Sequence, residues 1–160
     1  MPSFPVRIQE IPSVPLAVMR RRVQRNDLSR IVPEYCGLVW RELQSQGAKG
    51  GRHVAIYWNA DIALEVGAEF EGPLVEQNSV VRSATPAGLV ATATFFGPYA
   101  GLGAAHQAIR AFCEANGHRL RGPNWEIYGH WQPEWDASPS LIRTDVFYQI
   151  APAGAARTAV

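Results

Sequence analysis

The feature of the 160-residue sequence that most limits its possible folds is an internal repeat of secondary-structure patterns. Alternating apolar residues are typical of a strand, and apolar residues three or four apart are typical of a helix. Each copy has a strand, a helix and two further strands, over residues 16–23, 28–43, 53–58 and 62–70 in the first copy and 88–96, 102–113, 124–131 and 144–150 in the second. One copy is too small to cover its own sheet, so the pair predicts a single α+β domain.

The predicted domain spans residues 1–152, in two halves of about 5–72 and 78–152, and a flexible tail follows at 153–160. A further strand pattern at residues 6–11 belongs to the first half. Because each copy carries one helix, we expect a mainly antiparallel sheet with helices on one face and a central ligand cleft on the other.

The charge balance argues against attraction of the whole molecule to a polyanion. Lys and Arg number 15 and Asp and Glu 14, which gives a formal net charge of +1. A nucleic-acid-binding domain is usually far more basic, so direct nucleic-acid binding is not expected. The main basic run, at Arg20, Arg21, Arg22 and Arg25, is typical of a solvated edge strand. Contact of this run with a nucleic acid or a topoisomerase is the weaker interpretation.

Neither the cysteines nor the histidines indicate a metal site or a cofactor. Cys36 and Cys113 lie far apart in apolar helical patterns, which is typical of reduced core thiols. The four histidines do not have metal-ligand spacing. The sequence also has no pattern of a secretion signal or a membrane span. It therefore predicts a cytoplasmic protein without metal, cofactor or membrane contact.

Strand alternation predicts a group of side chains on the face opposite the helices. Glu126 and Tyr128 lie two residues apart in the second copy, where the first copy has Ala55 and Tyr57. The two tyrosines would therefore be symmetry mates across a cleft, with His53 at its mouth. The predicted ligand-binding residues are Glu126, Tyr128, Tyr57, Phe95, Phe147, Met19, Arg21, Ala93 and His53.

Glu126 is the most informative of these residues because it is a carboxylate among aromatic rings. An apolar environment disfavours a charged carboxylate unless a cation or hydrogen-bond donors come near it. Tyrosine rings add stacking and cation–π surface, which tolerates many planar ligands. The predicted ligand is therefore a lipophilic, aromatic or cationic small molecule. The alternative is that Glu126 pairs with Arg121 or Arg143 on a solvated sheet face.

Three segments resemble the GyrI-like family of small-molecule-binding domains, which occur in AraC- and MerR-type multidrug regulators and as stand-alone proteins. The segments are 122–128 (Gly-Pro-Asn-Trp-Glu-Ile-Tyr), 88–99 and 143–146. The resemblance covers essentially the whole chain and implies a duplicated strand–helix–strand–strand fold, with a central cleft in which Glu126 meets cationic or aromatic compounds. Because the sequence has no pattern of a helix-turn-helix domain, we expect a stand-alone member.

The resemblance implies three functions, because the family includes effector-sensing modules, enzymes that hydrolyse cyclopropane-bearing genotoxins, and a gyrase-inhibiting protein. We expect ligand binding first. In a hydrolase, Glu126 with Tyr57 or Tyr128 would be the catalytic residues, acting as general base and acid. Inhibition of gyrase or another topoisomerase is the weakest of the three. Binding and hydrolysis use the same residues, so spacing alone does not separate them.

Overall fold

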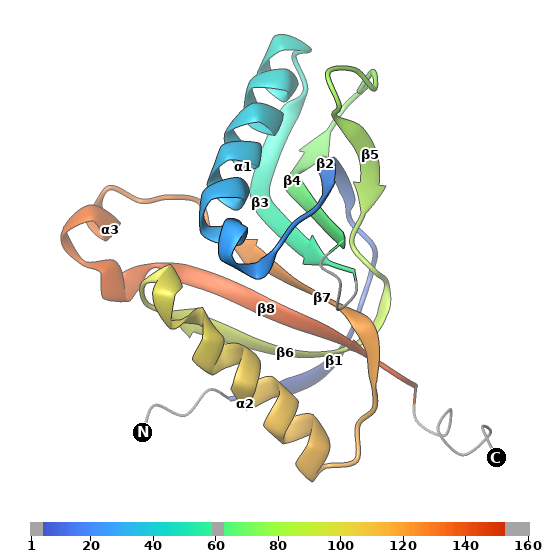
Figure 1. The fold of residues 1–160 in the computed structure, drawn as a ribbon, viewed down its shortest axis with the longest axis vertical. Helices are drawn as coiled ribbons and strands as arrows, with labels where there is room; N and C mark the ends of the chain where they lie inside the picture. The colour runs from blue at the N-terminus through green and yellow to red at the C-terminus, as the bar shows by residue number, and fades with distance from the viewer. Residues whose placement is uncertain (1–4, 59–62, 153–160) are drawn as a thin grey trace. The chain divides into compact units, whose positions relative to one another are not determined.

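The computed structural model describes residues 5–58 and 63–152, and the chain divides into two compact units. Unit 2 is Ser13–Pro86, and unit 1 combines the start of the chain, up to Pro12, with the segment from Ala87 onward. Within the described residues, each unit has four strands and one long helix (Figure 1). The repeated order predicted from the sequence is therefore present.

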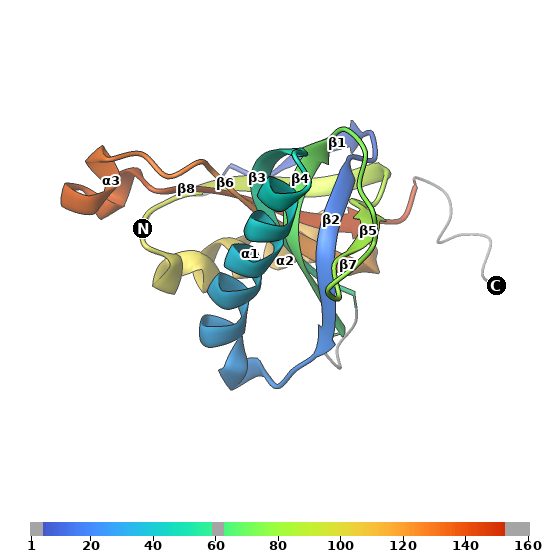
Figure 2. The same ribbon diagram turned by 90° about the horizontal axis from the view of Figure 1, so that it is seen from above.

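In unit 2, neighbouring strands are antiparallel and follow the order β3-β4-β2-β5. Its elements are β2 (Pro15–Arg22), the 3-10 helix η1 (Arg25–Asp27), α1 (Leu28–Ser45), β3 (Lys49–Tyr57), β4 (Ala63–Glu71) and β5 (Val81–Ala84). Figures 1 and 2 show α1 running along these strands. The buried residues of α1 recur every three or four positions, so one stripe of the helix faces the sheet.

Unit 1 has the strand order β1-β6-β8-β7, again with antiparallel neighbours. Its elements are β1 (Arg7–Ile11), β6 (Gly88–Phe96), η2 (Tyr99–Gly101), α2 (Leu102–Ala115), β7 (Leu120–Tyr128), α3 (Glu134–Ala137), η3 (Pro139–Leu141) and β8 (Arg143–Ile150). The short helices α3 and η3 fill the connection between β7 and β8, where the sequence has a polar, proline-containing loop.

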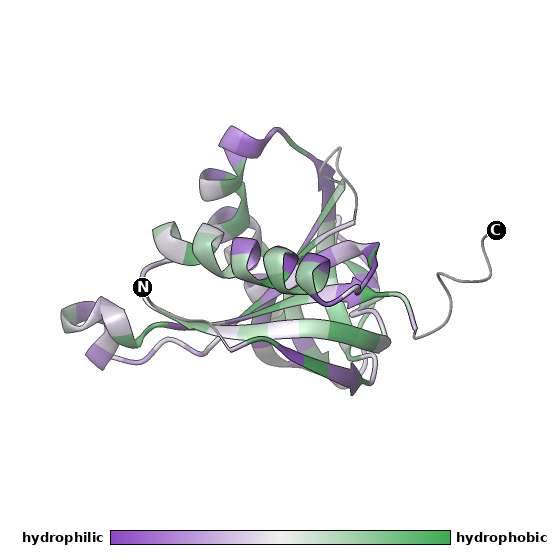
Figure 3. Ribbon diagram, turned by 90° about the horizontal axis from the view of Figure 1, so that it is seen from below, coloured by the Kyte–Doolittle hydropathy of each residue, from purple (hydrophilic) through white to green (hydrophobic). Residues whose placement is uncertain are grey.

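The long helix of each unit packs on one face of its own strands. In unit 1, Ala93 and Val146 of the strands are buried in one cluster with Ile109 of α2. In unit 2, Ala68 of β4 is buried with Val39 of α1. Figure 3 shows α2 with hydrophobic and hydrophilic segments in alternation, as expected for a helix with one buried side.

The two long helices end in the same way. The amide of Ala48 donates to the carbonyl of Leu43 at 3.0 Å, and the amide of His118 donates to the carbonyl of Cys113 at 2.9 Å. In each case the preceding residue is a glycine with a φ of 71° or 73°, which is the left-handed conformation of a helix C-terminal cap. The matched caps align Leu43 with Cys113 and thereby set the register between the two helices.

The α+β class and the mainly antiparallel pairing predicted from the sequence are confirmed. The strand at the start of the chain differs from the expectation, because β1 pairs with β6 and is part of unit 1, not of the first half. The reason is packing: Val6 and Ile8 lie against the apolar cluster of unit 1. The predicted tail at 153–160 lies outside the described residues.

Glu42, near the end of α1, anchors the turn that precedes β5. Its carboxylate accepts hydrogen bonds from Asn78 Nδ2 at 2.7 Å and from Gln77 Nε2 at 3.0 Å. Gln46 Nε2 and Ser45 Oγ, both on its own helix end, donate at 2.8 and 3.2 Å. Hydrogen bonds from Gln77 and then Asn78 are the main reason that the pKa of Glu42 falls from 4.5 to about 2.

Glu42→Gln is expected to make the free energy of unfolding depend less on pH at acidic pH. A pKa that is lower in the folded state stabilises the protein above pH 4.5, and this contribution is lost as the pH falls towards 2. Urea unfolding should therefore show the wild type losing stability over that range more steeply than Glu42→Gln. Glu114→Gln, at an exposed position on α2, is the charge-matched control and should follow the wild type. If the free energy of unfolding changed with pH in parallel for the wild type and Glu42→Gln, Glu42 would not be a source of the pH dependence.

Candidate functional site

Glu126 lies on the same face of unit 1 as helix α2. In the ladder, Glu126 of β7 and Ala93 of β6 are both paired with Val146 of β8, and residues directly opposite one another share a face. Ala93 and Val146 are packed against α2. The prediction that Glu126 faces away from the helices is therefore wrong. Strand alternation separates two faces, but it does not say which of them the helix covers.

The Glu126 carboxylate lies within a hydrogen-bonded chain of side chains and has a partner on each of its two oxygens. Tyr128 Oη donates to Glu126 Oε1 at 2.5 Å, and His106 Nε2 of α2 lies 2.6 Å from Glu126 Oε2. His106 Nδ1 lies 2.7 Å from the hydroxyl of Tyr148, and Arg110 Nη1 donates to the same hydroxyl at 2.9 Å. We call these five residues the Glu126 network.

The donor inventory assigns the protons of the Glu126 network. Arg110 can only donate, so the Tyr148 oxygen accepts from it and can give its own proton to His106 Nδ1. The imidazole then carries its proton on Nε2 and donates it to the carboxylate. In this arrangement, each of these contacts joins a donor to an acceptor. The network thus gives both carboxylate oxygens of Glu126, a residue that is only 6% exposed, a hydrogen-bond partner within the protein.

An exposed aromatic ring borders the Glu126 network. Tyr99 of η2 meets Tyr128 edge to face, with ring centroids 5.7 Å apart and an angle of 84° between the rings. Tyr99 is 45% exposed, whereas Tyr128 is half-buried and Glu126 is buried. The aromatic rings therefore run from solvent to the carboxylate, and together they present π surface beside a negative charge.

Unit 2 builds the same helix-on-sheet layer without the charge. Ala55 takes the position of Glu126, because it is paired with Val66 as Glu126 is with Val146. The same ladder comparison places Ala68 where unit 1 has Tyr148, and the matched helix caps place Cys36 where it has His106. Tyr128 does have a counterpart of the same type, because Tyr57 holds the equivalent position in unit 2. Since the layer packs well with Ala and Cys, packing does not require the Glu126 network.

The other predicted residues of unit 1 do not all gather on one face. Phe95 and Ala93 share the face of Glu126, and both are core residues. Phe95 is 7% exposed, and Ala93 is fully buried. Phe147 lies on the opposite face, where its ring stacks on Trp125 at a centroid distance of 5.4 Å. Arg143 forms an ion pair with Asp145 on that opposite face, at 3.3 Å, so the alternative pairing of Arg143 with Glu126 is wrong.

In unit 2, the predicted residues share the face that α1 covers. Met19 packs on the apolar cluster beneath α1, and Arg21, two residues along β2, has the same orientation. The His53 ring lies 5.3 Å from that of Trp40 on α1. Tyr57 is paired with Leu64, which is also paired with Arg21, and so belongs to this face. Each set of predicted residues is thus brought together within its own unit, apart from Phe147.

Sequence reasoning missed His106, Arg110 and Tyr148. A signal was present: His106 is four residues after Leu102 and three before Ile109, so it continues the buried stripe of α2. Tyr148 follows Val146 by two residues and therefore shares its face. A polar residue on a helix stripe that faces a strand-borne acid is a pattern that can be searched for.

The described residues contain no group of three or more His, Cys, Asp or Glu side chains arranged to hold a metal ion. Both cysteines are free thiols, and burial raises the pKa of Cys36 to about 12, so this thiol stays protonated. Among the helices in the described ranges, none has the length and apolar character required to cross a membrane.

Two units with the same element order make this a duplicated α+β protein, the class predicted from the repeat. The chain belongs to the GyrI-like family: the model of the GyrI-like small molecule binding domain matches residues 4–150. It is thus a GyrI-like small-molecule-binding domain. Among curated proteins, none matches the chain.

Solved structures share this fold at low sequence identity. The EcmrR C-terminal domain matches with a TM-score of 0.77 at 16% identity, over 94% of this chain and 99% of that chain. SAV2435 bound to tetraphenylphosphonium matches with a TM-score of 0.65 at 8% identity, over 92% and 94%. A hydrolase from Listeria innocua matches with a TM-score of 0.60 at 11% identity, over 94% of each chain. These likenesses establish the fold.

Proposed function

We propose that the Glu126 network receives the positive charge of a lipophilic, aromatic cation. The observation that carries this proposal is the asymmetry of the two units, since Glu126, His106 and Tyr148 of unit 1 replace small or apolar residues of unit 2. A buried charge is costly unless it is compensated. A charge that the packing does not need, held beside aromatic rings, is therefore best explained by a ligand.

The hydrogen bonds of Glu126 favour one kind of cation. Tyr128 and His106 already supply donors to the two carboxylate oxygens, so the charge is stabilised by the protein. A phosphonium or quaternary ammonium ion has no N–H group and forms no hydrogen bond with a carboxylate. Such a ligand still gains Coulomb attraction and cation–π contact. Tetraphenylphosphonium, which is bound in the structure of SAV2435, is a cation of this kind.

The test compares two ligands of closely matched shape and opposite charge, tetraphenylphosphonium and tetraphenylborate. Isothermal titration calorimetry should show the cation binding more tightly by about tenfold or more, because the charge is the main difference between the ligands. Equal affinities, or a preference for the borate, would show that hydrophobic contact alone selects the ligand and would contradict the proposal.

Hydrolysis is the second candidate, and one contact favours it. A carboxylate 2.6 Å from an imidazole nitrogen, with Tyr128 on its other oxygen, can take a proton from water while a hydroxyl supplies one to the leaving group. A structural neighbour is described as a hydrolase. In this reaction the oxygen of water would bond to a strained ring carbon as the ring bond breaks.

The binding proposal predicts no turnover. Incubation of the protein with a cyclopropane-bearing alkylator, followed by mass spectrometry, should show ring-opened product forming no faster than in buffer. Product that forms faster with the wild type, and at the buffer rate with Glu126→Gln, would establish the enzyme in place of the pure binding module.

A further inference from the structure

Positive charge is concentrated at the junction between β2 and α1 in unit 2. Residues 20–30 contain five arginines and one aspartate, a formal charge of +4 in a chain whose formal net charge is +1. Of these arginines, Arg20 is taken up by a salt bridge with the buried carboxylate of Glu65. Three of the others, Arg21, Arg22 and Arg30, line a pocket that the Glu126 network does not use.

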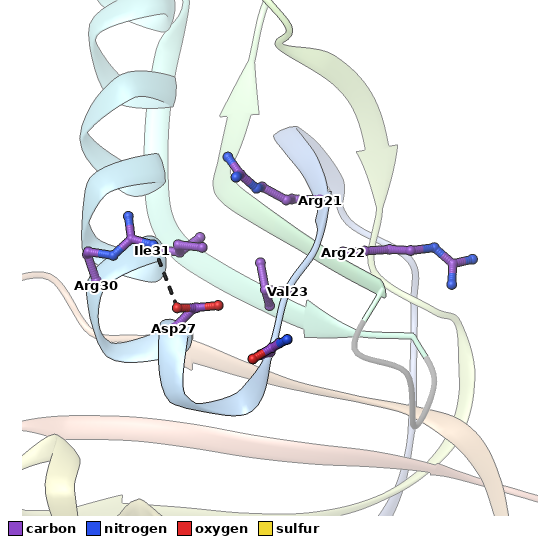
Figure 4. A pocket seen from close by; sticks show the side chains of 7 residues that line it. Arg21, Arg22, Val23, Asp27, Arg30 and Ile31 are labelled. Carbon is purple, nitrogen blue, oxygen red and sulfur yellow. Dashed lines mark ion pairs between the residues drawn. The ribbon is translucent and has the colours of Figure 1, made fainter.

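This pocket has a volume of about 300 Å³, which is at the lower end of the range for small-molecule sites. Its lining residues are Arg21, Arg22, Val23, Gln24, Asp27, Arg30 and Ile31. Figure 4 shows Arg21 approaching from β2 and Arg30 from the start of α1, whereas the side chain of Arg22 points away from the others. The pocket therefore has two guanidinium groups, from Arg21 and Arg30, and an apolar wall formed by Val23 and Ile31.

Arg21 is held in position by a tyrosine. Its Nη1 donates to Tyr35 Oη at 2.5 Å, and its guanidinium carbon lies 6.0 Å from the centroid of the same ring. Tyr35 is only 7% exposed and is fixed in the α1 stripe. One N–H of five is used, and the others form no hydrogen bond within the described part of the chain. An arginine fork held in this way binds an oxyanion with a smaller loss of side-chain entropy.

Arg30 has only long contacts with acids. Its Nη2 is 3.7 Å from Asp27 Oδ1 and its Nη1 is 3.6 Å from Glu34 Oε2, while the side chain is 66% exposed. Such exposed pairs contribute little to stability and can exchange for a ligand. Asp27 is the acid within the pocket (Figure 4), and with Arg21 and Arg30 it leaves a charge of +1 facing the space.

We infer that this pocket binds the phosphate or carboxylate group of a small organic molecule. The oxyanion lies between the forks of Arg21 and Arg30, which match its planar or tetrahedral oxygens. The carbon body of the ligand packs on Val23 and Ile31. This site takes a ligand of charge opposite to that proposed for Glu126, and it lies in the other unit, so the two proposals are independent.

Phenyl phosphate is the probe, because it combines one phosphate with one ring. Binding is measured by calorimetry at about 0.15 M salt, where diffuse attraction is largely screened. Arg21→Gln is expected to weaken binding by about tenfold or more. Arg25→Gln removes the same charge from outside the lining and should change the affinity by less than about twofold. Equal losses in the two variants would overturn the site in favour of a diffuse basic surface.

Four further measurements sharpen the test. Tyr35→Phe keeps the ring but removes the hydroxyl that holds Arg21, so weaker binding at unchanged charge is expected. Inorganic phosphate that binds as tightly as phenyl phosphate would overturn the organic ligand class. A short DNA duplex that binds more tightly than phenyl phosphate, with equal losses in Arg21→Gln and Arg25→Gln, would assign the surface to nucleic acid instead. Glu126→Gln should leave phenyl phosphate binding unchanged.

Discussion

Replacing Glu126 with glutamine is expected to lower the affinity for tetraphenylphosphonium by between about tenfold and 100-fold. Two opposite charges about 5 Å apart attract by about 3 kcal/mol at an effective dielectric constant of about 20. Arg110, at the far end of the Glu126 network, offsets part of that attraction. The hydrogen bonds from Tyr128 and His106 leave most of the attraction between Glu126 and the cation in place, because neither side chain has to carry a positive charge.

The glutamine variant should remain folded. Its carbonyl oxygen can accept from Tyr128, and its amide can donate to His106 Nε2 if the imidazole moves its proton to Nδ1. Glu114→Gln, an exposed change of the same charge on α2, is the control and should bind as the wild type does. Glu126→Gln should also leave the affinity for tetraphenylborate no weaker than in the wild type. An unchanged phosphonium affinity in Glu126→Gln would show that the charge of Glu126 does not act on the ligand.

Gly67→Ala is expected to cause the largest loss of stability, about 3 kcal/mol or more. Gly67 of β4 is paired with Val18 of β2, and a Cβ built on it would lie 1.8 Å from the carbonyl oxygen of Ala17. The obstacle is backbone, so no side-chain rotation can relieve the clash. The strands β2 and β4 would have to separate at the centre of unit 2.

The matched control is Gly37→Ala in the same unit. Gly37 lies inside α1, and a Cβ at this position would meet no atom within 4 Å. Alanine is the better helix former, so this variant should gain about 0.5–1 kcal/mol. Urea unfolding followed by circular dichroism measures both changes. A Gly67→Ala protein as stable as the wild type would mean that β2 and β4 are not packed as described.

The fold could be predicted because its information is local. The spacing of apolar residues predicts the buried stripe of each helix and the alternation of each strand. A glycine cap follows each of the two long helices. The partner of β1 could not be predicted, because a short alternating strand fits many edges. Its place is decided by the packing of Val6 and Ile8 against residues 80 or more positions away along the chain.

The candidate site could be predicted only in part. The pair Glu126 and Tyr128 was visible because residues two apart on a strand share a face. Whether α2 covers that face could not be predicted from the sequence, because both faces of β7 carry apolar residues. Large ones, such as Trp125 and Ile127, lie on the face away from α2. His106 was overlooked because its partner is 20 residues away, and only the packing of α2 on the sheet brings the two together.

The central claim, that the ligand's charge rests beside Glu126, is tested most directly by locating the cation itself. Tetraphenylarsonium has the shape of the phosphonium, and its arsenic gives an anomalous X-ray signal in a crystal of the complex. We expect the anomalous peak within about 6–7 Å of the Glu126 carboxylate, the range over which cation–π and Coulomb contacts act, close to the rings of Tyr128 and Tyr99. An arsenic peak against other residues, with none beside Glu126, would contradict the account.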